Sequence, residues 1–278
     1  MADIGITEIA AVTQSRVSEV IQTQLIEKSK LLGTVSSKWK PMPGESVIKI
    51  PRTGDFTVDN KVENVAVTAQ ILTYATDDLL LNLYKAIQFR VEDRAAIQAT
   101  PDVIEDMIKR SIAGIQLQVD TDIAACIAAV STAAPDHKIA YANATDLKKA
   151  DILEARALLH EANVPFNECF IGVSPRSETS LLAIDDFVHA DKYGSAEGLR
   201  NGELGRLYGA PVIMSTVFAD LETLVWHPDH VAFGFQLQAK FEKQRDVELL
   251  ADLYSVSQLY GCKTLDGGKR GVLLGTAV

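Results

Sequence analysis

Apolar residues recur at helical spacing over one long stretch of the chain. Between residues 100 and 132 they fall about every 3.7 residues, close to the 3.6 of one α-helical turn, at Ile104, Ile108, Ile112, Ile115, Val119, Ile123, Ile127 and Val130. Thr100 can cap such a helix, and Pro101 suits its first position. The predicted helix extends roughly 50 Å, nearly three times the mean globular helix of about 11 or 12 residues. We interpret it as a beam that links separate regions; the alternative is the core helix of an ordinary α+β domain.

Two different patterns precede this helix. Residues 6–32 place apolar positions at helical spacing with charges between them, which predicts an amphipathic N-terminal helix with Gly33 as its stop. Residues 39–84 alternate β-branched and polar side chains instead, and Asp59-Asn60-Lys61 has the composition of a turn. This segment therefore predicts a long β-hairpin. Because a two-stranded hairpin is marginally stable alone in water, we expect something else, such as another subunit, to pack against it.

An α/β pattern follows from residue 145 onward. A helix is predicted over 146–162, and Pro175 can open a second, shorter one. Strands are predicted at 168–173, 212–214, 221–226, 231–235 and 249–260. Glycines are frequent between 190 and 210, which predicts an irregular loop, with a structural turn at Gly202, Gly205 and Gly209 before the strand 212–214.

Composition narrows the function classes. The chain has 278 residues, 47% of them hydrophobic, which is ordinary for a globular protein with a real core. Its net charge of -10 is opposite in sign to that of a protein that binds nucleic acid tightly through phosphates. Three widely separated cysteines form no C-x-x-C pair, and no signal peptide or membrane-length apolar run is present, so we expect a protein made in a reducing cytosol.

Every motif that could carry chemistry is incomplete. His227-Pro228-Asp229-His230 offers two imidazoles without further nearby ligands, and His160-Glu161 lacks the second histidine of a zinc-peptidase helix. Ser174 and Ser177 lie outside any G-x-S-x-G elbow and are predicted to cap a helix. The glycine-rich loop matches no phosphate-binding pattern. The sequence therefore predicts no enzyme activity, no cofactor and no metal.

Taken in order, these parts resemble the major capsid protein family of tailed bacteriophages, those with the Hong Kong 97 phage fold. The most specific stretches are Leu158 to Pro165, Ile171 to Pro175 and Asn201 to Ser215, and the resemblance covers nearly the whole chain. It implies an α+β capsid fold in five parts. These are an N-terminal arm (1–40), an extended β-hairpin loop (41–85), a peripheral domain with a long spine helix (86–134), an axial α/β domain (135–228), and return strands of the peripheral domain with the C-terminus (229–278).

The resemblance also implies a function. It is that of a structural major capsid protein, which self-assembles through hexamers and pentamers into an icosahedral head enclosing double-stranded DNA without sequence-specific binding. Scaffolding, portal and decoration proteins are the implied partners, no membrane is involved, and the implied location is the virion, assembled in the host cytoplasm. Since the chain starts directly with the arm, we expect scaffolding to be separate or the chain to be a processed form. Intersubunit contacts are expected at the hairpin residues Arg52, Asp55, Asn60, Lys61 and Glu63.

Two alternatives stay open from the sequence. One is an encapsulin-like nanocompartment, a shell of the same fold that encloses protein cargo. The other is a soluble α/β enzyme whose glycine-rich loop forms a lid over a substrate. Particle size separates the enzyme from either shell.

Overall fold

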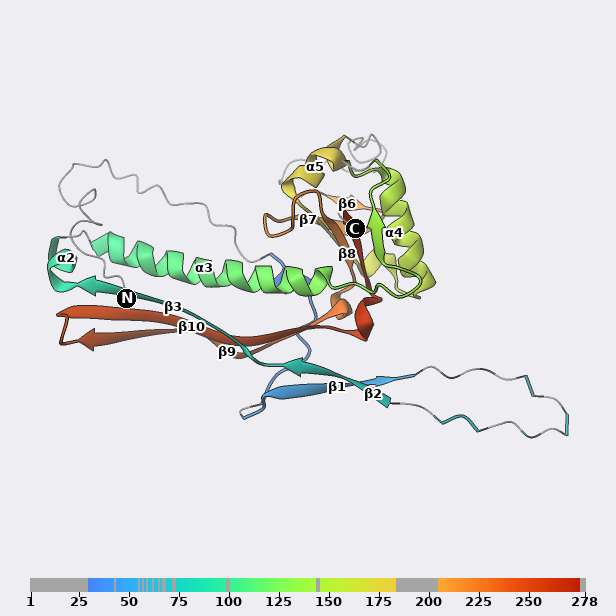
Figure 1. Cartoon of the computed structure of the whole chain (residues 1–278), viewed down its shortest axis with the longest axis horizontal. Helices are drawn as coiled ribbons and strands as arrows, with labels where there is room; N and C mark the ends of the chain where they lie inside the picture. The colour runs from blue at the N-terminus through green and yellow to red at the C-terminus, as the bar shows by residue number, and fades with distance from the viewer. Residues whose placement is uncertain are drawn as a thin grey trace.

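Within the part of the chain that the structure describes, three sheets accompany one long helix, α3. The computed structural model describes residues 30–42, 44–54, 74–98, 101–143, 146–183 and 205–275, with separate positions between 56 and 71. Figure 1 shows an elongated arrangement, in which the long helix α3 lies along a three-stranded sheet and a six-stranded sheet stands near one end of that helix. A two-stranded ribbon extends away from the rest of the molecule.

The helix α3 (Pro101–Ala128) confirms the prediction from the isoleucine stripe. Pro101 is its first residue, as expected, whereas Thr100 lies outside the described residues. Asp106 and Arg110, four residues apart on this helix, form an ion pair of 2.7 Å. No helix of the described ranges is both long enough and apolar enough to cross a membrane.

The sheet beneath α3 is antiparallel. Its strand order is β3 (Leu83–Glu92), β10 (Ala251–Thr264) and β9 (Val231–Asp246), and the short helix α2 (Asp93–Gln98) joins β3 to α3. The C-terminal half of α3 buries one face against β8, β9 and β10 in a cluster that includes Val119, Ile123, Ile127, Trp226, Phe233 and Tyr260. Burying several large apolar side chains contributes about 1.5–3 kcal/mol each, so this cluster holds helix and sheet together.

The six-stranded sheet is mixed. Its order is β4 (Lys138–Ala140), β11 (Gly271–Gly275), β8 (Thr223–Trp226), β5 (Phe170–Val173), β7 (Ala210–Met214) and β6 (Arg206–Leu207), and only the β4–β11 and β5–β7 pairs are parallel. The helices α4 (Lys149–Glu161) and α5 (Pro175–Leu182) accompany it, and a core including Ile152, Leu159, Ile171 and Val272 fills the space between the elements. As predicted, Ser174 caps α5, accepting a hydrogen bond from the Ser177 backbone N–H.

The predicted hairpin exists as β1 (Val47–Thr53) paired with β2 (Tyr74–Leu80). The described residues also contain short 3₁₀ turns, namely η1 (Leu32–Thr34), η2 (Phe166–Glu168), η4 (Pro228–His230) and η5 (Asp266–Gly268). Almost all of the predicted N-terminal helix lies outside the described residues. Gly33, expected as its stop, lies inside η1 instead.

Several boundaries differ from the sequence prediction. The strand expected from residue 168 begins at Phe170, because Phe166–Glu168 forms η2. The strand expected over 231–235 continues to Asp246. Its outer half is rich in charged residues and exposed, so it carries no apolar alternation that could mark it as a strand.

Candidate functional site

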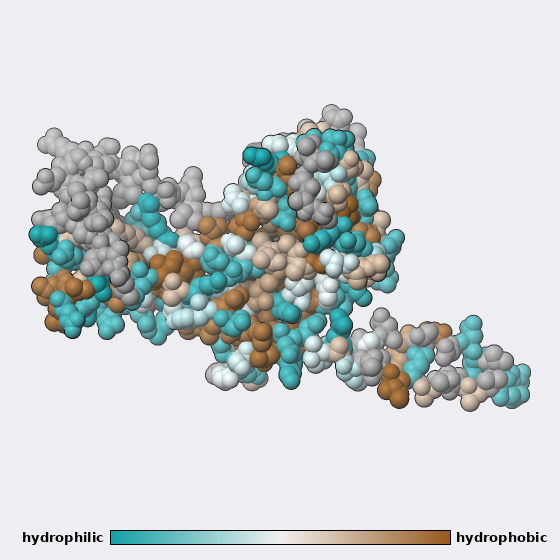
Figure 2. Space-filling model, in the orientation of Figure 1, coloured by the Kyte–Doolittle hydropathy of each residue, from teal (hydrophilic) through white to brown (hydrophobic). Residues whose placement is uncertain are grey.

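The outer part of the hairpin exposes apolar side chains. Phe56 is 65% exposed, Val58 93%, Ile71 93% and Tyr74 71%, and every described position between 56 and 71 is exposed. Figure 2 shows this segment standing clear of the body with apolar atoms on its surface. Monomeric proteins rarely leave apolar residues gathered in this way, so the hairpin has the character of a contact surface.

The base of the hairpin, in contrast, is fixed to its own chain. Ile50 and Leu79 pack with Ala232 and Leu265 in a small apolar cluster. Leu80 lies so close to β10 that a Cβ on Gly261 would run into the Leu80 carbonyl oxygen. The projecting segment is therefore held by a rigid support.

Polar contacts at the same base involve the turn η5. The Arg52 guanidinium forms an ion pair of 3.1 Å with Asp266, and the Asp77 carboxylate accepts a hydrogen bond of 3.1 Å from the Asp266 backbone N–H. Arg52, expected at a contact with another subunit, thus has an acidic partner inside its own chain. Asp55 lies outside the described residues, and the positions Asn60, Lys61 and Glu63 are exposed.

A second exposed apolar area lies at the far end of the three-stranded sheet. Val247, Leu249 and Leu250 lie in the β9–β10 turn at 74%, 47% and 60% exposure, and Ile97 on α2 is 84% exposed. The sequence patterns did not indicate a contact surface at these residues. The sequence predicts a strand over 249–260 that includes Leu249 and Leu250, whereas β10 begins at Ala251 and both residues lie in the turn, where side chains are usually polar.

Charged residues stiffen this end of the sheet. The guanidinium of Arg245 on β9 binds the carboxylate of Asp93 on α2 through two nitrogens, one of them at 2.6 Å. That hydrogen bonding lowers the pKa of Asp93 and raises the pKa of Arg245. The ammonium of Lys243 pairs with Asp252 at 2.8 Å, and this bond lowers the pKa of the Asp252 carboxyl. Because these groups are largely exposed, we assign them an orienting role rather than a large contribution to stability.

The glycine turn has a defined geometry where the structure describes it. Strands β6 and β7 pair through Leu207 and Ala210, which leaves Tyr208 and Gly209 as a two-residue hairpin turn with φ of 51° and 94°. Two positive φ values are typical of a type I′ turn. Gly205 also has a positive φ, of 79°, and Gly202 lies outside the described residues. A Cβ on Gly209 would come within 2.9 Å of the Asn167 side-chain oxygen.

Hydroxyl groups gather beside α5 without a base to activate them. The Ser174 hydroxyl lies 3.0 Å from that of Ser177, and the Tyr141 hydroxyl bonds both Ser177 and Thr223. Burial raises the pKa of Tyr141. A nucleophilic serine needs a hydrogen-bonded base, and the groups of the described residues that hydrogen-bond within this network are hydroxyls, the Ser177 backbone N–H and a backbone carbonyl. The arrangement is a structural network of buried hydroxyls.

The histidines of the H-x-x-H stretch serve separate neighbours. His227 lies 3.3 Å from the Glu168 carboxylate, whereas the buried His230 contacts the backbone oxygen of Ile127. Within the described ranges, no three histidine, cysteine or acidic residues come close enough together to hold a metal ion.

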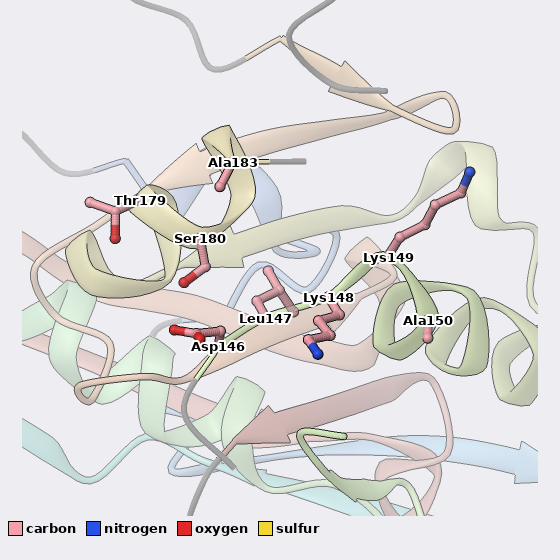
Figure 3. A pocket seen from close by; sticks show the side chains of 8 residues that line it. All are labelled: Asp146, Leu147, Lys148, Lys149, Ala150, Thr179, Ser180 and Ala183. Carbon is pink, nitrogen blue, oxygen red and sulfur yellow. The ribbon is translucent and has the colours of Figure 1, made fainter. Parts of the chain in front are cut away.

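An open hollow of about 700 Å³ lies between the start of α4 and the end of α5. Figure 3 shows the Asp146 and Lys148 side chains on one side of it and Thr179 and Ser180 on the other. The lining residues that the structure describes include no histidine or cysteine. They therefore offer neither a general base of neutral pKa nor a thiol nucleophile.

Comparison with known proteins gives structural matches only. No protein-family model matches the chain, and no curated protein matches it. A structure from Mycobacterium phage Che8 superposes with a TM-score of 0.74 at 22% identity, over 95% of this chain and 98% of that one. The capsid of cyanophage P-SCSP1u gives 0.74 at 13% identity, over 96% and 94%. The mature capsid of bacteriophage PhiM1 gives 0.73 at 13% identity, over 94% and 91%. The chain therefore has the α+β capsid fold of the Hong Kong 97 type.

Proposed function

We propose that this chain is the major capsid protein of a tailed-phage head or a related particle, and that it self-assembles into an icosahedral shell around double-stranded DNA. The observation that carries the proposal is the likeness to capsid structures over nearly the full length of both partners. Little of the chain is left over for a separate catalytic domain. Its work is then structural, and its main partner is a further copy of itself.

Two exposed apolar areas support this proposal. The outer hairpin and the β9–β10 turn project from opposite regions of an elongated subunit (Figure 1). A shell subunit needs several separate contact surfaces, because each copy touches several neighbours. Many weak interfaces can then stabilise a closed particle collectively.

The net charge supports a container for DNA. At -10 the subunit repels phosphate groups at long range, which limits adsorption of the packaged duplex to the shell. We accordingly propose that DNA is enclosed without sequence-specific contacts. Portal, scaffolding and decoration proteins are proposed as further partners, assembly is proposed to occur in the host cytoplasm, and the virion is the proposed final location.

The proposed parts of the subunit follow the elements. We assign residues 1–40 to an arm and 41–85 to the extended hairpin loop. Residues 86–134 and 229–278 form the peripheral domain with its spine helix and return strands, and residues 135–228 form the axial domain. In this assignment Gly205 and Gly209 shape a turn of the axial domain, and Asn60, Lys61 and Glu63 lie where the hairpin meets another subunit.

The direct test is to express the chain, alone and with the products of neighbouring genes, and to examine the product by size-exclusion chromatography and electron microscopy. We expect megadalton particles or capsomer rings. A subunit that stays monomeric under all of these conditions would refute the proposal. Particles that contain protein cargo and no nuclease-protected DNA would instead indicate an encapsulin-like compartment.

One substitution tests the hairpin as a contact. Val58→Asp places a charge on a side chain that is 93% exposed, so the subunit should fold normally while burial of that position between subunits becomes unfavourable. We expect loss of particles and retention of soluble capsomers or monomers with an unchanged circular dichroism spectrum. Val58→Thr is the matched control and should still assemble. Wild-type particle yields from Val58→Asp would show that this position is not buried between subunits.

A further inference from the structure

Two of the three cysteines meet across the interface between the long helix and the sheet. Cys126 lies near the C-terminal end of α3 and Cys262 lies on β10, far away in the sequence. Both are free thiols and both are partly exposed. Both side chains pack against the apolar cluster that contains Ile123, Ile127 and Tyr260, and each thiol shifts the pKa of the other. The two thiols are therefore neighbours at the interface between α3 and β10.

Neighbouring hydrogen bonds fix this meeting on both sides. Side chains two residues apart on a strand point to the same face, so Tyr260, Cys262 and Thr264 all face α3. The Tyr260 hydroxyl donates to the Asp122 carboxylate at 2.5 Å, and the Thr264 hydroxyl donates to the Cys126 backbone oxygen at 2.7 Å. The thiol pair lies between these two bonds, so helix and strand cannot slide past one another without breaking them.

The chemical environment distinguishes the two thiols. The interaction with the Cys262 thiol lowers the pKa of Cys126, an effect that burial and the Asp122 carboxylate oppose and the Lys263 ammonium assists. The same interaction, followed by burial, raises the pKa of Cys262. Since the thiolate is the nucleophile in disulfide exchange, Cys126 is the thiol that reacts first. Partial exposure lets a small oxidant reach it.

The third cysteine provides an internal contrast. Cys169 is fully buried, its thiol donates to the Pro165 backbone oxygen at 3.4 Å, and burial raises its pKa to about 12. A thiol of this kind is inert toward exchange in the folded protein.

We propose that Cys126 and Cys262 are a disulfide-forming pair that covalently joins the long helix to the sheet when the protein meets an oxidising environment. The co-reactant is a small disulfide such as oxidised glutathione. The bond encloses residues 127–261, which include β4 to β9, α4 and α5. It joins the two ends of that loop, the last turns of α3 and the C-terminal part of β10. This inference concerns the single chain and does not depend on the proposed shell function.

The reaction balances as two exchanges. The Cys126 thiolate attacks one sulfur of glutathione disulfide and expels a glutathione thiolate, leaving a mixed disulfide on Cys126. A negative charge on Cys126 disfavours ionisation of Cys262, and this first step removes that charge. Cys262 then loses its proton to solvent, attacks the Cys126 sulfur and expels the second glutathione thiolate. Two protein thiols are oxidised to one disulfide, and one glutathione disulfide is reduced to two thiols.

The experiment is a thiol count on the folded protein in its native assembly state. The reduced protein has three cysteines per chain. After incubation with oxidised glutathione, acid quenching and denaturation, we expect one free thiol. We also expect a cross-linked peptide that joins Cys126 to Cys262 and a faster-migrating monomer band on a non-reducing gel, reversed by dithiothreitol. Three remaining thiols, a disulfide that involves Cys169, or disulfides between chains would overturn the proposal.

Variants keep the test specific. Cys169→Ser is the matched control: it should lose both of its remaining thiols and gain the same cross-link. Cys262→Ser removes the resolving thiol, so it should stop at a glutathione adduct on Cys126 and show no band shift. In urea, where the hydrogen bonds that align the pair are absent, the preference for this pair over pairs with Cys169 should disappear. Equal preference in the folded and unfolded protein would also refute the assignment.

Discussion

Acid should destabilise this protein through one buried histidine. His230 is fully buried at the junction of α3, η4 and β9, where its Nε2–H donates to the Ile127 backbone oxygen at 3.0 Å. Burial lowers its pKa to about 4, an effect that the Ile127 hydrogen bond opposes and the nearby His137, Arg270 and His227 reinforce. Among the described residues, the charged or titratable groups that shift this pKa are His137, Arg270 and His227, so a proton on the ring is unfavourable in the folded state.

The sign and size of the effect follow from linkage. The unfolded histidine titrates near its ordinary pKa of about 6.5, so as the pH falls the unfolded chain takes up the proton first. The contribution of His230 to the free energy of unfolding is then nearly constant above about pH 7. It falls from about pH 6.5 to about pH 4, where the folded state also takes up the proton. Between pH 7 and pH 5 this single group should remove about 2 kcal/mol.

The assay is urea unfolding at pH 7 and pH 5 at one protein concentration, followed by tryptophan fluorescence, since Trp226 is completely buried. His230→Gln keeps a donor for the Ile127 oxygen but cannot titrate. The variant will be less stable at pH 7, yet it should lose about 2 kcal/mol less than wild type between the two pH values. His160→Gln, at an exposed position on α4, is the control and should keep the wild-type dependence. The same pH dependence in His230→Gln and wild type would refute the reasoning.

Three further predictions concern the turn, the hairpin base and the helix-to-sheet contact. Gly209→Val should lower the free energy of unfolding by at least about 1–2 kcal/mol and yield insoluble chains or failed assembly, because Gly209 has a positive φ and faces Asn167. The control Gly33→Val places its side chain in open space and should have no such effect. Soluble Gly209→Val particles of normal size would contradict this. Gly261→Ala should loosen the hairpin, measured as faster proteolysis after residue 54, because its Cβ would meet the Leu80 carbonyl; an unchanged cleavage rate would oppose this. Tyr260→Phe should lower the urea midpoint by the equivalent of about 1–2 kcal/mol through loss of the hydroxyl bond to Asp122, and an unchanged midpoint would argue against that bond.

The elements that could be predicted are those in which buried apolar residues recur at a regular spacing or form a continuous run along the sequence. The helix α3 carries an apolar stripe over most of its length, so nearly every turn contributes an apolar residue to the same face. Strand β5 is short and almost completely buried, and its run of apolar residues was sufficient to predict a strand there. The outer half of β9 failed this test because both of its faces are exposed, so its residues satisfy neither period.

Contacts between distant segments were beyond prediction for a different reason. Nothing in the spacing of Cys126 and Cys262 shows that β10 crosses α3 one turn after Asp122. The turn at Gly209 was expected from its glycine, but the two-residue hairpin also depends on Tyr208 having a positive φ, which no side-chain preference indicates. Arg52 was expected to meet another subunit, and its carboxylate partner Asp266 lies in its own chain at the other end of the sequence.

The apolar residues of the exposed hairpin do not match the surroundings that they have in the single chain. Alternation of apolar and polar residues normally indicates a strand with one buried face, yet Val58 and Ile71 are each 93% exposed in the single chain. A lone subunit gains nothing from apolar side chains at these positions. They lower the free energy only if another surface covers them, at about 25 cal/mol per Å² of apolar area removed from water. The pattern is therefore best understood as that of the assembled state, and the covering surface is, on the proposed function, a second copy of this chain.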